Sequence, residues 1–326
     1  MTTATPAKPP PAGSARPVVG ETPTAGRAGR RRRIADRQRP LWLLLPGGLL
    51  TALVIVIPLL IAVYISLIDL NLYTFREWVR APFIALRNYF DAVKDEGLLH
   101  SVAISVEYAV IVTVVTLPIG VAAGLATQNR FHGRGLVRSV LLIPYVLPAF
   151  VVGTIWRIIL QPGGIANGLL KHVGVYGGLW LNGPMSFWAL VLVQIWSSWP
   201  LLYLLTLAGL QSVDPVLYEA ATLDGADWRA KLRYVVLPRL RGPVSLGLVI
   251  AFLHNVNSFT LPFVLFGVPS PRDVAVLPVL TYTESFQNSA FGLSAAMAVV
   301  SLLLIAVPLA VYLRAVRLTV AEDRLR

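Results

Sequence analysis

Six long apolar runs constrain the fold of this sequence more than any other feature. A helix needs roughly 20 residues to cross the hydrocarbon core of a bilayer. Each run reaches that length, at residues 41–68, 101–127, 136–160, 187–210, 244–266 and 291–313. Only helices and closed barrels satisfy all their backbone hydrogen bonds inside lipid. The runs therefore predict an all-α integral membrane protein with six transmembrane helices. Gly120 and Gly124 in the second run form a small-xxx-small pair of the kind that can mark close helix packing.

The composition agrees with a membrane protein. Of 326 residues, 56% are hydrophobic and 13% are charged, and the mean hydropathy is +0.69. A soluble domain fills its core with far fewer apolar residues. The chain has no cysteine, so disulfides, thiolate metal sites and cysteine nucleophiles are excluded. Its four histidines are scattered without a second ligand at metal-binding spacing, so we predict no metal site.

The distribution of Lys and Arg predicts how the chain is oriented in the membrane. These residues number 9 before the first run, 3 in residues 128–138, 5 in residues 211–241 and 4 after residue 313, or 21 in all. The segments on the opposite side hold 4, 1 and 1. Cytoplasmic loops carry the excess of positive charge in membrane proteins. We therefore expect a multi-pass protein of the cell membrane with both termini and the 211–241 segment in the cytoplasm.

The ends of the chain are predicted to be tails. Residues 1–40 are rich in Pro, Ala, Thr and Arg, with four consecutive arginines at 30–33, and are expected to be a disordered, basic cytoplasmic tail. A nucleic-acid patch is the alternative, although a basic flank beside a first span is far commoner. A cleaved signal peptide is disfavoured, because the following run is too long and lacks a small-residue cleavage site. Residues 41–316 then form the membrane domain, and residues 317–326 a cytoplasmic C-terminal tail.

A polar island between the fourth and fifth runs has the signals of two short helices joined by a tight corner. Asp214 can cap a first helix at residues 215–223, which begins on a proline. Gly225 can leave that helix at positive φ. Asp227 can cap a second helix, which we expect Pro238 to end as the chain turns into the fifth span. The island is predicted to be a rigid elbow suited to docking in another protein's groove.

The elbow also carries a family signature. It reads Glu219-Ala220-Ala221, then Asp224-Gly225-Ala226, then Val235 and Leu237-Pro238. This pattern resembles the EAA loop of permease subunits in binding-protein-dependent ABC importers, with Val235 in place of the usual Ile. In that family the loop, here residues 214–241, is a coupling helix held in a cleft of a separate cytoplasmic ATPase. The resemblance assigns ATPase coupling to Glu219, Ala220, Ala221, Asp224, Gly225, Ala226, Leu237 and Pro238. The plainer alternative is an ordinary amphipathic cytosolic loop.

The outer loops resemble those of carbohydrate-type permeases. Residues 69–100 include a run at 83–89 that predicts a short helix at the outer surface and ends on an Asn-Tyr pair. Residues 161–168, after the third run, are also similar to that subgroup. The likeness covers nearly everything from residue 41 onward. It implies the type I permease architecture of an ABC importer for sugars, of the maltose kind.

Polar groups inside the spans predict a substrate path. Trp199-Pro200 in the fourth run and His254-Asn255 in the fifth lie at similar depths, near the midplane, by the 1.5 Å rise of a helix. Hydroxyls and amides beside indole rings suit a polyhydroxylated, uncharged ligand. In maltose-type permeases the corresponding polar segment lines the sugar site. The alternative is that these groups hydrogen-bond neighbouring helices. The residues predicted to line the path are Ser198, Trp199, Leu201, Ala251, His254, Asn255 and Ser258.

The chain has no phosphate-binding loop of its own. None of its four lysines follows a glycine, so the Gly-Lys-Ser/Thr motif is absent and the chain is expected not to be an enzyme. The resemblance implies a second, related permease, two ATPase subunits that use ATP and Mg²⁺, and an external substrate-binding protein. We expect no cofactor bound by this chain and no nucleic-acid partner.

Other functions stay open at this point. A secondary transporter would need an ion-binding group deep in the bundle, where only His254 is titratable. A membrane-embedded enzyme would need clustered acids, histidines or a metal. An ABC importer for a glycerol phosphodiester, a peptide or an ion is the closest competitor. The sequence does not distinguish a mono-, di- or oligosaccharide as substrate.

Overall fold

The computed structural model describes residues 44–94, 97–174 and 178–323, and it divides into two units, residues 1–58 and 59–326. The predicted 1–40 tail lies outside the described residues. In the first unit, residues 44–58 are helical, with a π-helical turn at Ala52–Val56 and exposed apolar side chains. The helix α2 (Ile57–Ile65) continues this run across the unit boundary.

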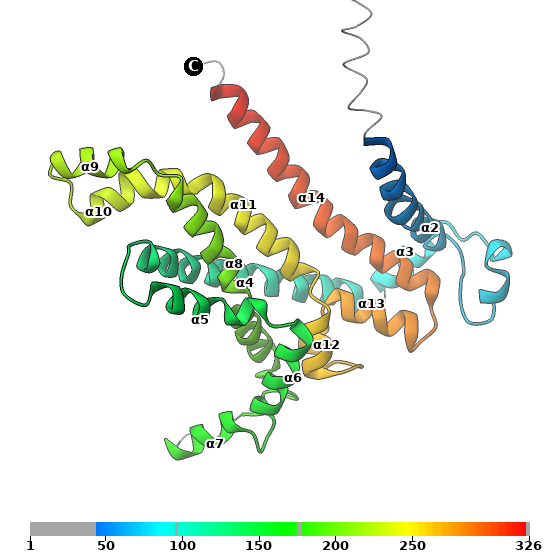
Figure 1. Cartoon of the computed structure of the whole chain (residues 1–326). Helices are drawn as coiled ribbons and strands as arrows, with labels where there is room; N and C mark the ends of the chain where they lie inside the picture. The colour runs from blue at the N-terminus through cyan, green and yellow to red at the C-terminus, as the bar shows by residue number, and fades with distance from the viewer. Residues whose placement is uncertain (1–43, 95–96, 175–177, 324–326) are drawn as a thin grey trace, which may run out of the picture. The chain divides into compact units, whose positions relative to one another are not determined.

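The second unit is built from helices, as Figure 1 shows. Six helical runs in the described chain are long and apolar enough to cross a membrane: Leu44–Ile65, Gly97–Thr127, Ala149–His172, Ser186–Gln211, Trp228–Val256 and Phe291–Arg317. The helices after α2 are α3 (Arg87–Lys94), α4 (Gly97–Thr127), α5 (Arg134–Val146), α6 (Ala149–Leu160), α7 (Ile165–His172), α8 (Ser186–Gln211), α9 (Pro215–Leu223), α10 (Trp228–Lys231), α11 (Leu237–Val256), α12 (Thr260–Phe266), α13 (Leu277–Phe286) and α14 (Phe291–Asp323). The all-α class and the number of six spans are confirmed. The third and fifth candidate spans are Ala149–His172 and Trp228–Val256, whereas the predicted runs were 136–160 and 244–266.

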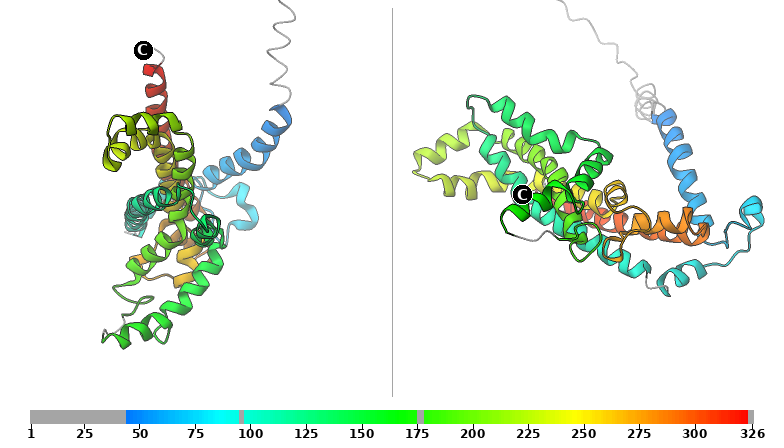
Figure 2. Two further views of the ribbon diagram at one scale, coloured as in Figure 1. Left: turned by 60° about the vertical axis from the view of Figure 1, so that its left-hand side comes forward. Right: turned by 90° about the horizontal axis from the view of Figure 1, so that it is seen from below.

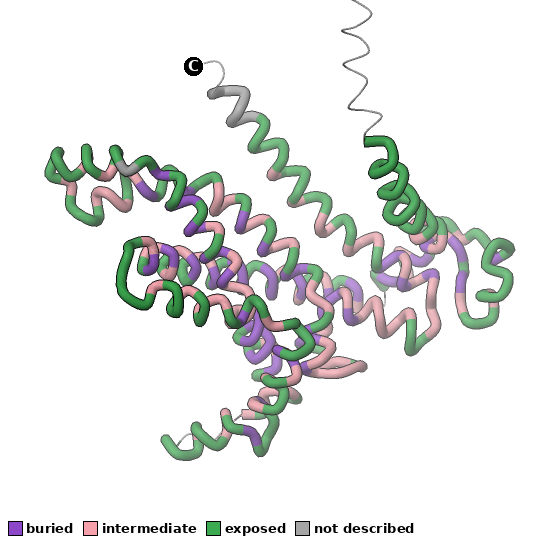
Figure 3. The backbone as a smooth tube through the Cα atoms, in the orientation of Figure 1, coloured by how far each residue is buried: buried purple, intermediate pink, exposed green. Residues whose placement is uncertain are grey.

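The helices α4, α8 and α11 pack against one another and form the centre of this unit. Glycines allow the close approach. A Cβ atom added at Gly120 would lie 2.7 Å from Cβ of Leu202, and one added at Gly124 would lie 2.6 Å from Cγ2 of Thr206. A Cβ added at Gly247 of α11 would lie 2.7 Å from Cδ1 of Leu205 and 2.8 Å from Cδ2 of Leu202, both on α8. The small-xxx-small pair therefore does mark a helix contact, and Figure 3 shows the most buried backbone in this region.

Two predicted spans are interrupted. The run at 136–160 breaks at Leu147, which is extended because the following Pro148 disfavours helical backbone there. The run at 244–266 breaks between Val256 and Thr260. The cause is Pro262, which cannot donate to the carbonyl of Ser258 and whose ring would clash with it in a continuous helix. Hydropathy alone could not reveal either break.

The predicted outer helix is displaced along the chain. Instead of residues 83–89, the helix is α3, which begins at Arg87 because Ala85 has a φ of +52°. The buried Asn88 side chain donates to the carbonyls of Ser66 (2.9 Å) and Ile68 (3.0 Å), and the amide of Gly292 donates to Leu70 (2.8 Å). These bonds tie the chain after α2 to the start of α14. At the other end, α14 continues to Asp323, beyond the predicted start of the C-terminal tail at residue 317.

Candidate functional site

The predicted elbow is present, with its first helix at the expected bounds. The Oδ1 atom of Asp214 accepts from the amide of Val216 (3.0 Å) and caps α9, and Oδ1 of Asp227 accepts from the amide of Ala230 (2.7 Å) and caps α10. Gly225 has a φ of +75°, the left-handed conformation that glycine adopts without strain. The corner is closed by the amide of Ala226, which donates to the carbonyl of Ala221 (2.9 Å).

The elbow exposes apolar side chains. Leu223, at the tip of α9, is 89% exposed, and Trp228 on α10 is 68% exposed. Val216 and Tyr234 are exposed as well. Figures 1 and 2 show α9 and α10 side by side at one end of the second unit, and Figure 3 shows the same segment largely exposed. Val216 and Leu223 lie outside the six candidate spans, and exposed apolar side chains on such a segment are typical of a protein-protein contact.

Pro238 does not end the second arm of the elbow, contrary to prediction. The helical run continues from Trp228 to Val256 without a turn. A π-helical turn at Leu232–Val236 precedes the proline, which then lies in the first turn of α11, where a missing amide donor costs least. The elbow and the fifth span are therefore one lever, about 40 Å long at 1.5 Å per residue.

An apolar cluster fixes the elbow to the bundle. Leu210 at the end of α8 packs with Val236 and Leu240, and Tyr218 of α9 packs against these three side chains. The Tyr218 hydroxyl is buried and has no hydrogen-bond partner among the described residues. Burial raises the pKa of Tyr218 above its ordinary value of 10, so the phenol is neutral at physiological pH. Its contribution is therefore packing.

Two substitutions at Tyr218 separate the ring from the hydroxyl. Tyr218→Ala removes a half-buried ring from the cluster, and we expect it to lower the free energy of unfolding by about 1–3 kcal/mol. Tyr218→Phe keeps the ring and removes only the unpaired hydroxyl, so the melting temperature should stay the same or rise. Thermal unfolding of the detergent-purified protein measures both. An equal loss of stability in the two variants would mean that the hydroxyl has a partner and would contradict this interpretation.

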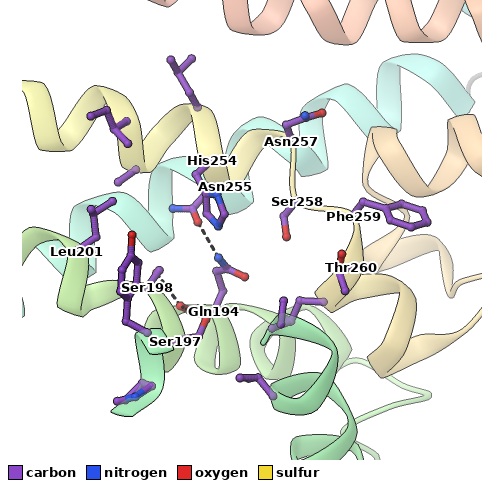
Figure 4. Close-up of a pocket in the computed structure, with 18 of the residues that line it drawn as sticks. Gln194, Ser197, Ser198, Leu201, His254, Asn255, Asn257, Ser258, Phe259 and Thr260 are labelled. Atoms are coloured by element: carbon purple, nitrogen blue, oxygen red, sulfur yellow. Dashed lines mark hydrogen bonds between the residues drawn. The ribbon is translucent and has the colours of Figure 1, made fainter. Parts of the chain in front are cut away.

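The fifth and fourth spans meet at a pocket of about 470 Å³. It lies beside the break between α11 and α12, and residues from α5, α6 and α8 complete it. Figure 4 shows polar side chains pointing into it from α8, α11 and the break. Its polar lining residues are Tyr145, Gln194, Ser197, Ser198, His254, Asn255, Asn257, Ser258 and Thr260.

The pocket brings together six of the seven residues predicted for the substrate path. Ser198, Leu201, Ala251, His254, Asn255 and Ser258 all line it. Trp199 is not among its lining residues, and its ring packs against Tyr203 at a centroid distance of 6.0 Å. The expectation of indole rings beside the amides is therefore wrong for this pocket, whose aromatic side chains are Tyr145 and Phe259. Ser258 lies in the break that follows α11 and reaches the pocket from there.

Sequence reasoning missed Gln194, Ser197, Asn257 and Thr260. The sequence could have indicated Gln194, because a lone amide inside an apolar span must find a polar partner. Its Nε2 donates to Oδ1 of Asn255 at 2.9 Å, and Figure 4 draws this bond. Ser197 was detectable only from packing, since its hydroxyl bonds within its own helix to the carbonyl of Gln194 (3.1 Å).

The pocket is polar and uncharged. No Asp, Glu, Lys or Arg of the described ranges lines it. Hydroxyl, amide and imidazole groups provide both donors and acceptors there, with Phe259, Leu201 and Ile250 as apolar walls. Nothing in this lining would balance a phosphate, a carboxylate or a metal ion. The chemistry is that of a site for a neutral ligand with many hydroxyl groups.

The chain is similar to proteins of a known transport family. Residues 116–318 match the family described as binding-protein-dependent transport system inner membrane component. A probable ABC transporter permease protein of Sinorhizobium fredii is 30% identical over 88% of this chain and 94% of the relative. A trehalose/maltose transport system permease protein of Thermococcus litoralis is 27% identical over 72% and 79% of the two chains.

A solved structure supports the same fold. A chain of a bacterial ABC transporter involved in the import of the acidic polysaccharide alginate has a TM-score of 0.72 to this one. The match covers 87% of this chain and 99% of that chain at 19% identity. This likeness concerns the fold, while the residues matched by the family make up more than half of the sequence. The chain belongs to the family of binding-protein-dependent transport system inner membrane components.

Proposed function

We propose that this chain is a transmembrane permease subunit of an ATP-driven importer, and that it moves a neutral sugar across the cell membrane by alternating access. The observation that carries the proposal is the lever Trp228–Val256, which has the exposed elbow at one end and the pocket at the other. A displacement of the elbow is transmitted along a single helix to the residues that line the pocket.

The elbow is the proposed ATPase contact. Exposed Glu219 and Asp224 offer charges to basic groups of the ATPase cleft, while Leu223 offers an apolar contact. The small side chains of Ala220, Ala221 and Ala226 allow the cleft to approach α9 closely. Leu237 and Pro238 lie where the second arm enters the fifth span and carry the movement onward. No residue of this chain is assigned a role in ATP hydrolysis.

The uncharged pocket supports a neutral sugar as substrate. Relatives are named as permeases for trehalose/maltose in Thermococcus litoralis and for sulfoquinovosyl glycerol in Agrobacterium fabrum. The second ligand carries a sulfonate, for which this pocket has no cationic partner in the described chain. A volume of about 470 Å³ lies in the range of small-ligand sites and accommodates a disaccharide better than a long polymer. Glycerol phosphodiesters, peptides and ions are disfavoured for the same electrostatic reason.

The proposal implies an assembly in the inner membrane. It contains a second, related permease that completes the path, two ATPase subunits that use ATP and Mg²⁺, and an external protein that delivers the sugar. Both termini and the elbow face the cytoplasm, as the excess of Lys and Arg on that side favours. The parts of the six spans that face neither the second permease nor the bundle contact lipid.

Co-purification and transport test this function together. The tagged chain, extracted from its native membrane, should bring down an ATPase and a second permease. After reconstitution in vesicles with the binding protein, labelled maltose or trehalose should accumulate only when ATP is supplied on the elbow side. Accumulation driven by a proton or sodium gradient without ATP would instead identify a secondary transporter. A purified assembly without an ATPase would contradict the proposal.

A further inference from the structure

A buried chain of polar side chains joins the three central helices. The Asn255 side chain on α11 accepts a bond from Gln194 of α8 at 2.9 Å, and its Nδ2 donates to Oγ1 of Thr113 on α4 at 3.3 Å. All three side chains are buried: Asn255 is 1% exposed, Gln194 is 3% exposed and Thr113 is 6% exposed. Each bond links a different pair of helices, so the chain spans the bundle at one level.

These three hydrogen-bonded side chains lie where a movement of the fifth span would affect them. Asn255 is the last residue but one of α11, the helix that continues from the elbow. Gln194 also accepts bonds at its carbonyl from the pocket hydroxyls of Ser197 and Ser198, the latter at 2.7 Å. A hydrogen bond is lost when its heavy atoms separate beyond about 3.5 Å. A shift of α11 by about 1 Å away from α8 along the bond between Gln194 and Asn255 would lengthen it from 2.9 Å to about 3.9 Å and break it.

We propose that Gln194, Asn255 and Thr113 form a latch that locks the pocket end of the lever in the sugar-free state. The inference rests on the proposed function. The Asn255 amide lines the pocket, and its Oδ1 already accepts from Gln194, so a sugar hydroxyl that takes the place of this donor displaces Gln194. Sugar arrival then releases α11, and the elbow becomes free to follow the ATPase. Gln194 and Thr113 are positioning residues, and they make ATP hydrolysis depend on sugar.

The plainer alternative is that these bonds only satisfy buried polar groups. Both alternatives predict that removing a partner lowers stability, because the remaining amide is left buried without a bond. Only the latch predicts that the loss frees the lever. The distinguishing measurement is thus ATP hydrolysis in the absence of sugar, which a purely structural defect would lower or leave unchanged.

The test uses the complete reconstituted transporter with its binding protein. Gln194→Met and Thr113→Val keep side-chain size and remove the bonding groups. We expect each to raise sugar-free ATP hydrolysis about fivefold to tenfold, the shift that follows from losing one buried hydrogen bond. Thr116→Val is the matched control. Thr116 is buried on the same helix, but its hydroxyl bonds only to carbonyls of α4, so its removal should not raise the rate.

Exchanging the amide side chains at positions 194 and 255 should restore the low sugar-free rate of ATP hydrolysis. Gln194→Asn shortens one side of the pair and Asn255→Gln lengthens the other, so each alone should raise the sugar-free rate. The double variant restores the combined length, and its rate should return to within about twofold of the unmodified protein. Failure of this rescue, or unchanged sugar-free hydrolysis in Gln194→Met and Thr113→Val, would overturn the latch. Either result would leave ATP-driven uptake by the unmodified protein intact, whereas failure of the proposed function would abolish that uptake.

Discussion

Gly225→Pro is expected to reduce ATP-driven uptake to below about a tenth of its normal level while the protein still inserts into the membrane. Proline holds φ near −65°, whereas residue 225 requires +75°. The substitution also removes the amide that donates to the carbonyl of Thr222 at 3.1 Å. A distortion of about 3 kcal/mol or more is therefore imposed on the corner between the two arms. The proposed ATPase contact on α9 is then misplaced relative to the lever.

The Gly225→Pro substitution affects only the backbone of the corner, because there is open space around this residue. A Cβ atom added there meets nothing within 4 Å, so the substitution should not disturb packing in the bundle. Gly225→Asn is the matched control, since asparagine tolerates the left-handed conformation and keeps the amide. It should retain most of the uptake. Normal uptake by Gly225→Pro, measured in vesicles at equal protein level, would exclude the elbow from coupling.

Gly120→Leu should have the largest effect on stability. A Cβ atom at this position would lie 2.8 Å from the backbone nitrogen of Tyr203 and 2.9 Å from the carbonyl carbon of Leu202. Backbone atoms in a helix cannot move aside, so α4 and α8 must separate. We expect a loss of more than about 3 kcal/mol, which thermal unfolding in detergent and the amount of folded protein in the membrane would both reveal.

A second glycine provides the control for that result. Gly135 is the second residue of α5, and a Cβ atom added there meets nothing within 4 Å. Gly135→Ala should therefore be neutral or stabilising, by up to about 1 kcal/mol from helix propensity. If Gly120→Leu were as stable as Gly135→Ala, the contact between α4 and α8 would not be the centre of the fold.

The elbow was predictable because its signals act over a few residues. The caps at Asp214 and Asp227 and the corner at Gly225 depend on backbone groups within three positions, and the structure has all three where they were expected. Pro238 was misjudged because a proline ends a helix only when no other turn can absorb it. The π-helical turn before it depends on the packing of Val236 against α8, which the local sequence does not contain.

The pocket was predictable in its location and less so in its details. The depth of Asn255 in the bilayer could be estimated by counting residues from the start of the fifth span at about 1.5 Å each. The breaks at Leu147 and Asn257 were not, because a hydropathy pattern ignores where backbone donors are missing. Trp199 turned away from the pocket since the rotation of α8 is set by its glycine contacts with α4 and α11. Those contacts involve residues far apart in the sequence.

Cross-linking from the tip of the elbow tests the central claim most directly. The chain has no cysteine, so Leu223→Cys introduces a single thiol at the most exposed apolar position of α9. In native membranes a thiol-reactive cross-linker should join this residue to an ATPase subunit, and ATP should change the yield. Labelling of Cys-substituted protein by an impermeant reagent added outside intact cells, with no cross-link to an ATPase, would contradict the account.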